Sequence, residues 1–375
     1  MKKKVWIGIV ALVATMVLVA IVSCSSKKET TVINIGVIMP LTGDAAIYGV
    51  PSFKAMKLAV SQAEADLLVK GVRVELIPED SQAKPAIGVS AIQKLISVNR
   101  VKVVLGPLAS SVTLAVAPIA ESNKVVLLSP SSSALAITSA GDYIFRTELS
   151  EYFGGLAQAD LAIDKLSYKK VACIYINNDY GASLFEVFKE RFSKRGGIIT
   201  FAEAFAQGTT DFRATLAKIS TVQSDAIFVI SHDEILNFVR QKVKLGIKVP
   251  IYTTPMFEDR RNLEKLGPLA NGVIYTYYGS FDPDIKLGPT GSFIQAYEAT
   301  FGEPPTYYAA LAYDATRILL KALEITKFQP AELKDALYQV KSFEGVTGDM
   351  SFDKNGDILK TVSLKTVKDG NFTFF

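Results

Sequence analysis

The chain has 375 residues, 49% of them hydrophobic, a formal net charge of +4, one histidine and two cysteines. This length exceeds what one hydrophobic core comfortably fills, so we expect two domains. Two cysteines provide no metal-type spacing. A single histidine, His232, leaves little on which to build a conventional Ser-His-Asp or Cys-His catalytic centre.

The first residues have the pattern of an export signal. Lys2 to Lys4 precede an uncharged run from Val5 to Val22, and Ser23 and Cys24 follow. A basic start, an apolar stretch and small residues before a cleavage site are typical of such signals. A membrane-spanning helix is the alternative, because the run reaches the short limit of a span.

The segment Ile21-Val22-Ser23-Cys24 resembles the lipobox of bacterial lipoproteins, in which the cysteine is lipidated and becomes the first mature residue. We therefore predict a signal peptide over residues 1–23, lipidation of Cys24 and a lipidated tether over 24–31. The protein would be exported and anchored by lipid to the cell envelope, facing the periplasm or the extracellular side.

The predicted mature chain is nearly neutral. Removing residues 1–23 leaves 352 residues, and loss of their three lysines lowers the formal net charge from +4 to +1. A chain of this charge is not expected to bind nucleic acid or another acidic polymer. Cys173, inside the apolar "VACIYI", is predicted to be buried and inert, with no second cysteine available for a disulfide.

From Val32 onward, short apolar runs alternate with amphipathic helical stretches. "VINIGVIMPL" reads as a buried strand, and a helical stretch with Phe53, Met56 and Val60 on one face follows it. The pattern runs to about residue 145 and restarts from about 170 to 278, and a helical block and a strand-like tail follow. Such alternation indicates parallel sheets covered by helices. We predict an α/β fold of two doubly wound parallel-sheet lobes with a ligand cleft between them.

Ligands of open parallel sheets bind beyond the carboxyl ends of the strands, at helix N-termini. Four stretches are predicted to lie there: "PLTGDAAIYG", "GPLASS", "SPSSS" and "NNDYGAS". The serines of "GPLASS" and "SPSSS" provide uncharged hydroxyl donors beside unpaired backbone N–H groups, a combination suited to a small carboxylate. The alternative is that Ser110 and Ser133 are ordinary helix N-caps.

Two tyrosines lie in the same predicted region. Tyr48 follows a glycine-containing loop after the first strand, and Tyr180 lies in "NNDYG", just past a strand end. Half-exposed packing is the alternative for both side chains. Their place at the predicted cleft makes them candidate ligand contacts.

No pattern for catalysis, metal binding or a cofactor is found. His232 lies in "VISHDEIL", which holds no nucleophile motif, and the phosphate-binding, dinucleotide-binding and HExxH motifs are absent from the sequence. "DKNGD", residues 353–357, partly resembles a calcium loop, but Ile358 and Leu364 replace the required glycine and glutamate. We predict a hairpin turn there, and a protein that is not an enzyme and holds neither a metal nor a cofactor.

Several of these stretches together match a known family. "INIGVIMPLTGDAAIYG", "GPLASSVTLAVAPIAESNKVVLLSPSSS", "IFRTELSEYFGG", "NNDYGAS" and "PTYYAALAYDATRILLKALE" resemble the leucine/isoleucine/valine-binding proteins. These are type I periplasmic solute-binding proteins of branched-chain amino acid ABC transporters. The resemblance spans residues 32–375.

The resemblance implies two lobes joined by a three-segment hinge that close over a solute. Lobe 1 would comprise residues 32–147 and 280–343, and lobe 2 residues 148–279 and 344–375. The chain would cross between them near 145–150, 275–281 and 343–349. The implied partners are a small-molecule ligand, the permease of an ABC transporter and the membrane, through the lipid. A monomer is expected.

The resemblance also implies ligand contacts. In relatives a serine in the position of Ser110, and a small-residue segment corresponding to Ser131, Ser132 and Ser133, hold the ligand carboxylate. Aromatic residues like Tyr48 and Tyr180 wall the pocket from lobe 1 and lobe 2.

The chain departs from the family pattern at the ammonium site. Relatives place a tyrosine where this chain has "SHD", residues 231–233, and a glutamate where it has "TTPMFEDRR". Asp233 or Glu258 would receive a ligand ammonium, or no ammonium is present. The ligand would be a small amino acid, branched-chain or related. The alternatives are a non-amino-acid carboxylate or amide, and a sensory module that reports ligand to a membrane receptor.

Overall fold

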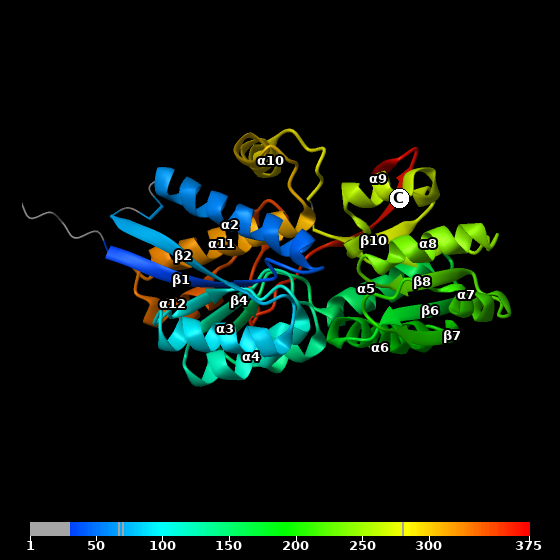
Figure 1. Cartoon of the computed structure of the whole chain (residues 1–375), viewed down its shortest axis with the longest axis horizontal. Helices are drawn as coiled ribbons and strands as arrows, with labels where there is room; N and C mark the ends of the chain where they lie inside the picture. The colour runs from blue at the N-terminus through cyan, green and yellow to red at the C-terminus, as the bar shows by residue number, and fades with distance from the viewer. Residues whose placement is uncertain (1–30, 67, 70, 280) are drawn as a thin grey trace, which may run out of the picture.

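The protein consists of two α/β lobes, seen side by side in Figure 1. The computed structural model describes residues 31–66, 68–69, 71–279 and 281–375. The predicted signal peptide, Cys24 and the tether up to residue 30 lie outside the described residues. Within those ranges, no helix combines the length and the apolar character needed to cross a membrane.

Lobe 1 is built on a five-stranded sheet in which all neighbouring strands are parallel. Its strands follow the order β2 (Val72–Asp80), β1 (Thr31–Met39), β3 (Val103–Leu105), β4 (Val126–Ser129) and β5 (Ile144–Arg146). Its helices are α2 (Ala46–Ala65), α3 (Pro85–Ser97), α4 (Ser110–Ser122), α10 (Gly288–Phe301), α11 (Tyr307–Ile325) and α12 (Leu333–Gln339), with 3-10 turns η1 (Leu135–Ser139) and η4 (Pro330–Glu332).

The core of lobe 1 joins segments that lie far apart in the sequence. The strand β1 ends in a continuous buried run, because helices cover both faces of a parallel sheet. The late helix α11 lies along the early helix α2, shown in orange and blue in Figure 1. Most of the α11 side chains are buried, so this helix is interior to the lobe.

Lobe 2 is built on a seven-stranded sheet with a parallel part and an antiparallel edge. The order is β14 (Asn371–Phe374), β13 (Val362–Lys368), β10 (Ile274–Tyr278), β9 (Ile251–Thr253), β8 (Ala226–Ile230), β6 (Lys170–Ile176) and β7 (Ile198–Phe205). The strands β6 to β10 pair in parallel, whereas β13 is antiparallel to both β10 and β14. Its helices are α5 (Glu151–Asp164), α6 (Asp179–Lys194), α7 (Arg213–Ser220), α8 (Glu234–Lys244) and α9 (Arg260–Leu266), with 3-10 turns η2 (Pro255–Phe257) and η3 (Gly267–Ala270).

The helix α6 illustrates how local sequence sets an element of lobe 2. Asn178 caps it, and its side chain accepts a hydrogen bond from the Gly181 N–H group at 2.9 Å. Phe185, Phe188 and Phe192 then recur on one face and are buried against the sheet. The free thiol of Cys173 is buried in the same core, as predicted.

The third crossover lies later in the chain than predicted. The hairpin β11 (Phe343–Gly345) and β12 (Gly348–Met350) stays with lobe 1, because the Asp314 carboxylate of α11 accepts the N–H groups of Val346 and Thr347 at 2.8 Å. The chain continues along lobe 1 to Asp357 and joins the lobe 2 sheet only at β13. Residues 344–357, which we expected in lobe 2, therefore pack with lobe 1, since a distant carboxylate determines where this segment lies.

The "DKNGD" segment forms the predicted turn. The Asp353 carboxylate accepts the N–H groups of Asn355 and Asp357 at 2.8 and 3.0 Å, and an antiparallel bridge joins Phe352 to Ile358. The Asp357 side chain is engaged elsewhere, in a contact with Arg146.

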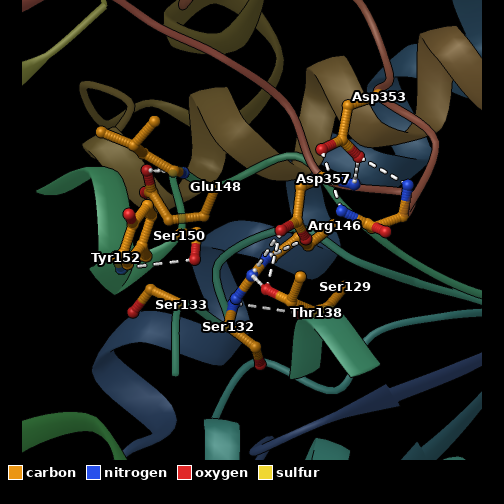
Figure 2. A network of polar contacts seen from close by, with 12 residues as sticks. Ser129, Ser132, Ser133, Thr138, Arg146, Glu148, Ser150, Tyr152, Asp353 and Asp357 are labelled. Atoms are coloured by element: carbon orange, nitrogen blue, oxygen red, sulfur yellow. Dashed lines mark hydrogen bonds and ion pairs between the residues drawn. The ribbon is translucent and has the colours of Figure 1, made fainter. Parts of the chain in front are cut away.

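Arg146, the last residue of β5, forms a buried ion pair with Asp357 (Figure 2). Its Nε and Nη2 atoms donate to the Asp357 carboxylate at 2.6 and 2.9 Å. Its remaining groups donate to the Thr138 hydroxyl at 2.5 Å and to the Ala134 carbonyl at 2.8 Å. The side chain of Arg146 is 0% exposed, so its charge is balanced by the Asp357 carboxylate and its N–H groups find acceptors within the protein.

We predict that Asp357→Asn lowers the free energy of unfolding by about 3–5 kcal/mol, because it leaves the Arg146 charge buried without a counter-ion. Urea unfolding of the variant and the parent measures this. The matched control is Glu186→Gln, which breaks the exposed pair with Lys189 and should change stability by less than about 0.5 kcal/mol. Equal effects of the two variants would contradict the prediction.

Candidate ligand-binding site

A cavity of about 250 Å³ lies between the two lobes. It is formed by the loops that follow β1, β3 and β4 in lobe 1 and β6, β7, β8 and β9 in lobe 2, where the carboxyl ends of parallel strands meet. Its volume is below the range of about 300–1,000 Å³ typical of drug-sized ligands, so the site suits a smaller molecule. The lining residues include Tyr48, Leu108, Ser110, Ser111, Ser131, Ser133, Tyr180, His232, Asp233, Met256 and Tyr308.

The two serine clusters meet at the lobe 1 wall of the cavity. The Ser110 hydroxyl accepts the N–H groups of Ser133 and Ala134, both at 3.2 Å, so it joins the loop after β3 to the loop after β4. Ser110 is the first residue of α4, and Ala109 holds the N-cap position. Ala134 holds the corresponding position of η1. The alternative that Ser110 and Ser133 are N-caps was wrong.

Ser132 does not line the cavity. Its hydroxyl is fully buried, 2.8 Å from the Thr113 hydroxyl and 3.0 Å from the Leu108 carbonyl to which it donates. Ser132 thus connects its loop to α4 and to the loop after β3. Ser132 was predicted to contact the ligand, but it instead holds its loop in place. Ser131 and Ser133, on either side of Ser132, do line the cavity.

Aromatic side chains wall the cavity from both lobes. Tyr48 and Tyr308 pack together in lobe 1 with ring centroids 4.7 Å apart. In lobe 2, Tyr180 stacks on His232 at 5.4 Å, and its hydroxyl donates to the Thr254 hydroxyl at 3.1 Å. Both predicted tyrosines therefore lie in the wall. Burial lowers the pKa of His232, so this ring stays neutral near pH 7.

Hydrogen bonds join the lobes around the cavity. The Tyr48 hydroxyl donates to the Asp233 carboxylate at 2.5 Å. The Arg261 guanidinium donates to the Ile47 carbonyl at 3.3 Å, and the Leu135 N–H group donates to the Ser183 hydroxyl at 2.9 Å. Asp233 lines the cavity as predicted, but one of its oxygens already has a partner across the cleft.

Glu258 is turned away from the cavity. Its carboxylate accepts the Lys365 ammonium at 2.6 Å, and both side chains are buried. Burial raises the pKa of Glu258 to about 7, while Lys365 opposes the rise. Met256 faces the cavity instead. The predicted role of Glu258 as a ligand contact is not what the geometry supports, because a lysine from β13, distant in the sequence, holds its carboxylate.

Three cavity features were not predicted as ligand contacts. His232 was considered only as a catalytic residue, although its position beside Asp233 after β8 places it at the same edge. Tyr308, at the start of α11, comes from a helix more than 250 residues after β1, and the "PTYYAA" stretch gave no sign that its side chain would reach the cavity. The loop from Gln207 to Thr210 also contributes, from the end of β7.

The arrangement is suited to binding. Hydroxyl groups and the N-terminus of α4 lie at one wall, and aromatic rings and a methionine lie at the others. Across the described ranges, no group of three or more histidine, cysteine, aspartate or glutamate side chains could hold a metal ion.

Sequence comparison identifies the family. The profile of the periplasmic binding protein family matches residues 32–371. The chain belongs to this family. Periplasmic binding proteins bind solutes outside the cytoplasm and are not enzymes, in agreement with the prediction. The predicted fold class, two α/β lobes with mainly parallel sheets, is also confirmed.

Individual members of the family are similar along nearly the whole chain. Leu/Ile/Val-binding protein homolog 2 of Brucella abortus is 26% identical over 328 residues, 87% of either chain. The branched-chain amino acid transporter substrate binding protein LivJ of Streptococcus pneumoniae, solved with isoleucine, is 30% identical, with a TM-score of 0.83 over 91% of this chain and 98% of that one. An ABC transporter solute binding protein of Rhodopseudomonas palustris, solved with 3,4-dihydroxybenzoic acid, is 26% identical, with a TM-score of 0.81 over 91% and 95%.

We predict that Tyr48→Phe opens this periplasmic binding protein in the absence of ligand, because it removes the hydroxyl that bonds Asp233 across the cleft. A loss of about 1 kcal/mol lowers the ratio of closed to open molecules about fivefold. Small-angle X-ray scattering should record a larger radius of gyration. Tyr152→Phe, which changes an exposed ring on α5, is the control. An unchanged radius for Tyr48→Phe would contradict the prediction.

Proposed function

We propose that this protein captures a small amino acid, branched-chain or related, in the cavity between its lobes and delivers it to an ABC importer. The observation that carries the proposal is the cavity itself: small, with hydroxyl groups at the lobe 1 wall and apolar groups opposite. The names of the Brucella and Streptococcus relatives agree with such a ligand.

The ligand carboxylate would bind at the lobe 1 wall. The first backbone N–H groups of α4 have no partner within the helix, and the positive end of the helix dipole favours an anion there. The hydroxyl groups of Ser110 and Ser133 add donors without a competing charge. The Ser131 hydroxyl lines the same wall but already donates to the Leu108 carbonyl at 3.1 Å. The aliphatic part of the ligand would then lie against Leu108, Met256 and the aromatic rings.

Capture would proceed by closure of the lobes. Lobe 1 provides the carboxylate contacts, so the ligand would bind there first, and Tyr180, His232 and Asp233 would complete the pocket when lobe 2 closes. The closed surfaces would then dock on the permease of the importer. We also infer that the protein acts as a monomer, held to the envelope by lipid on Cys24.

The second candidate ligand is a carboxylate without an amino group, or an amide. Met256, where relatives are expected to place an acidic residue, favours this candidate. The Rhodopseudomonas palustris relative, solved with an aromatic acid, is a family member with such a ligand.

We predict that the melting temperature of the protein rises with leucine, isoleucine, valine or alanine, and rises less with the matching deaminated acids and amides. A ligand at one hundred times its Kd stabilises the folded state by about 2.7 kcal/mol, which a thermal-shift assay detects. No shift with any of these compounds would reject the proposal. Stabilisation by deaminated acids alone would favour the second candidate.

We predict that Ser110→Ala weakens binding of the stabilising compound about ten- to one-hundredfold, because a hydrogen bond to a charged group contributes about 1.5–3 kcal/mol. Ser97→Ala, at the exposed end of α3, is the matched control and should bind like the parent. Isothermal titration calorimetry measures both. Equal affinities of the two variants would exclude Ser110 from carboxylate binding.

A further inference from the structure

Glu151, the first residue of α5, has a carboxyl group that is buried and incompletely hydrogen-bonded. The residue is 2% exposed. Its Oε2 atom has no hydrogen-bond partner among the described residues. Buried acceptors in proteins are normally satisfied, so this oxygen requires an explanation.

Glu151 lines a small chamber that lies beside the ligand cavity. Its volume is about 10 Å³, close to what one water molecule needs. An ammonium group is of similar size. Ser133, Tyr180 and Met256 line this chamber together with Glu151, and the same three residues also line the ligand cavity. Three shared residues therefore place the chamber that holds the Glu151 carboxyl group next to the ligand cavity.

The backbone fixes Glu151 at this place. Its N–H group donates to the Ser133 carbonyl at 2.7 Å, which ties the start of α5 to the serine segment. Ser150 caps the helix through the N–H group of Tyr152. The Glu151 carboxyl group therefore lies close to the serine segment proposed to bind the polar end of the ligand. It lines the same chamber as Met256, the residue found where an acidic side chain was expected.

Asp44 also lines the cavity but is exposed to solvent, whereas the buried and half-buried carboxylates around it already have partners. Asp233 accepts the Tyr48 hydroxyl, and Glu234 accepts the N–H groups of Gly208 and His232 at 2.8 and 3.0 Å. Glu148, which also lines the chamber, accepts the Leu149 N–H group at 2.7 Å and the Tyr307 hydroxyl at 3.1 Å.

We propose that Glu151 receives the ammonium group of the bound amino acid and so distinguishes amino acids from their deaminated analogues. This proposal rests on the amino-acid ligand proposed above. The ammonium would lie against the Oε2 atom of Glu151, which lacks a partner in the described part of the chain, at the mouth of the small chamber. Glu151 thereby takes the place of the acidic residue expected after β9, from a different segment of the chain.

The protonation state of Glu151 gives the proposal a measurable consequence. Burial raises the pKa of Glu151 to about 8, Glu148 adds to the rise, and the Ser133 hydroxyl and Arg146 oppose it. At pH 7 the ligand-free carboxyl group is mostly neutral. An arriving ammonium favours the ionised form, so Glu151 releases its proton to solvent as the amino acid binds.

Burial raises the pKa of Glu148 as well, so the Glu151→Gln variant is needed to distinguish the two carboxyl groups. Burial raises the pKa of each neighbouring tyrosine, so these hydroxyls stay neutral up to pH 8. The Arg146 charge is paired with Asp357, and the hydrogen-bonded Glu148 faces Lys360, whose pKa burial lowers. The groups that face Glu151 or its neighbour are Arg146, Glu148, Tyr180, Tyr278, Tyr307 and Lys360.

We predict that binding of the stabilising amino acid, chosen among L-leucine, L-isoleucine, L-valine and L-alanine, releases nearly one proton at pH 7. Its affinity should rise by roughly tenfold per pH unit from pH 6 to about 8, where Glu151 must lose its proton to bind, and level off above. Calorimetry in buffers of different ionisation enthalpy counts the protons. The deaminated acid of the same side chain should bind without proton release.

Two variants complete the test. Glu151→Gln should release no proton, bind the amino acid with an affinity independent of pH, and bind it more than tenfold more weakly than the parent at pH 8. Glu258→Gln, which changes a buried carboxyl group outside the cavity, should keep the release. If Glu151→Gln fails to fold, the parent protein still tests the proposal, because amino-acid binding without proton release overturns the role of Glu151.

The outcomes distinguish failure of the Glu151 proposal from failure of the proposed function. Amino-acid binding without proton release, or with release retained in Glu151→Gln, overturns the role of Glu151 and leaves the proposed function standing. Release that disappears only in Glu258→Gln assigns the ammonium to that residue and likewise overturns it. Absence of amino-acid binding at every pH overturns both proposals.

Discussion

The arrangement of the site depends on one buried ion pair, between Arg146 and Asp357. Arg146 ends β5 just before the first crossover, and the same guanidinium donates to the Ala134 carbonyl, directly after the serine segment. A single charged group therefore fixes the serine loop, the crossover and the loop of Asp357 relative to one another. Two charges buried at this depth are tolerated only because each has a counter-ion and its hydrogen bonds are made.

The polar groups around the cavity are of two kinds, according to whether they bond to the protein or remain available to a ligand. Those that shape the loops are engaged with the protein itself, as Ser132 is with Thr113 and Glu258 with Lys365. Ser110 and Ser133 face the cavity, and Glu151, in the chamber beside it, has an Oε2 atom without a partner in the residues that the structure describes. Loops held in place by bonds within the protein preorganise the site for a small solute.

The sequence predicted the features that depend on local pattern. Apolar periodicity predicted the two sheets, and strand ends followed by small residues predicted that Ser110, Ser131, Ser133 and Tyr180 would meet. What it did not predict depends on partners far along the chain: Lys365 turns Glu258 away, and Asp314 holds the third crossover segment to lobe 1. Neither Lys365 nor Asp314 is marked by a local sequence pattern, because a lysine or aspartate that becomes buried has the same sequence context as an exposed one.

The position of the third crossover also has a consequence for how the chain folds. Lobe 1 requires α11 to pack beside α2 and Asp357 to pair with Arg146. The Arg146–Asp357 pair alone is separated by 211 residues in the sequence. Neither lobe is complete until the last part of the chain has been synthesised, because β13 and β14 close the lobe 2 sheet at the very end. Contacts of such long sequence separation slow folding. Both lobes would therefore stay incompletely folded for most of the synthesis of the chain.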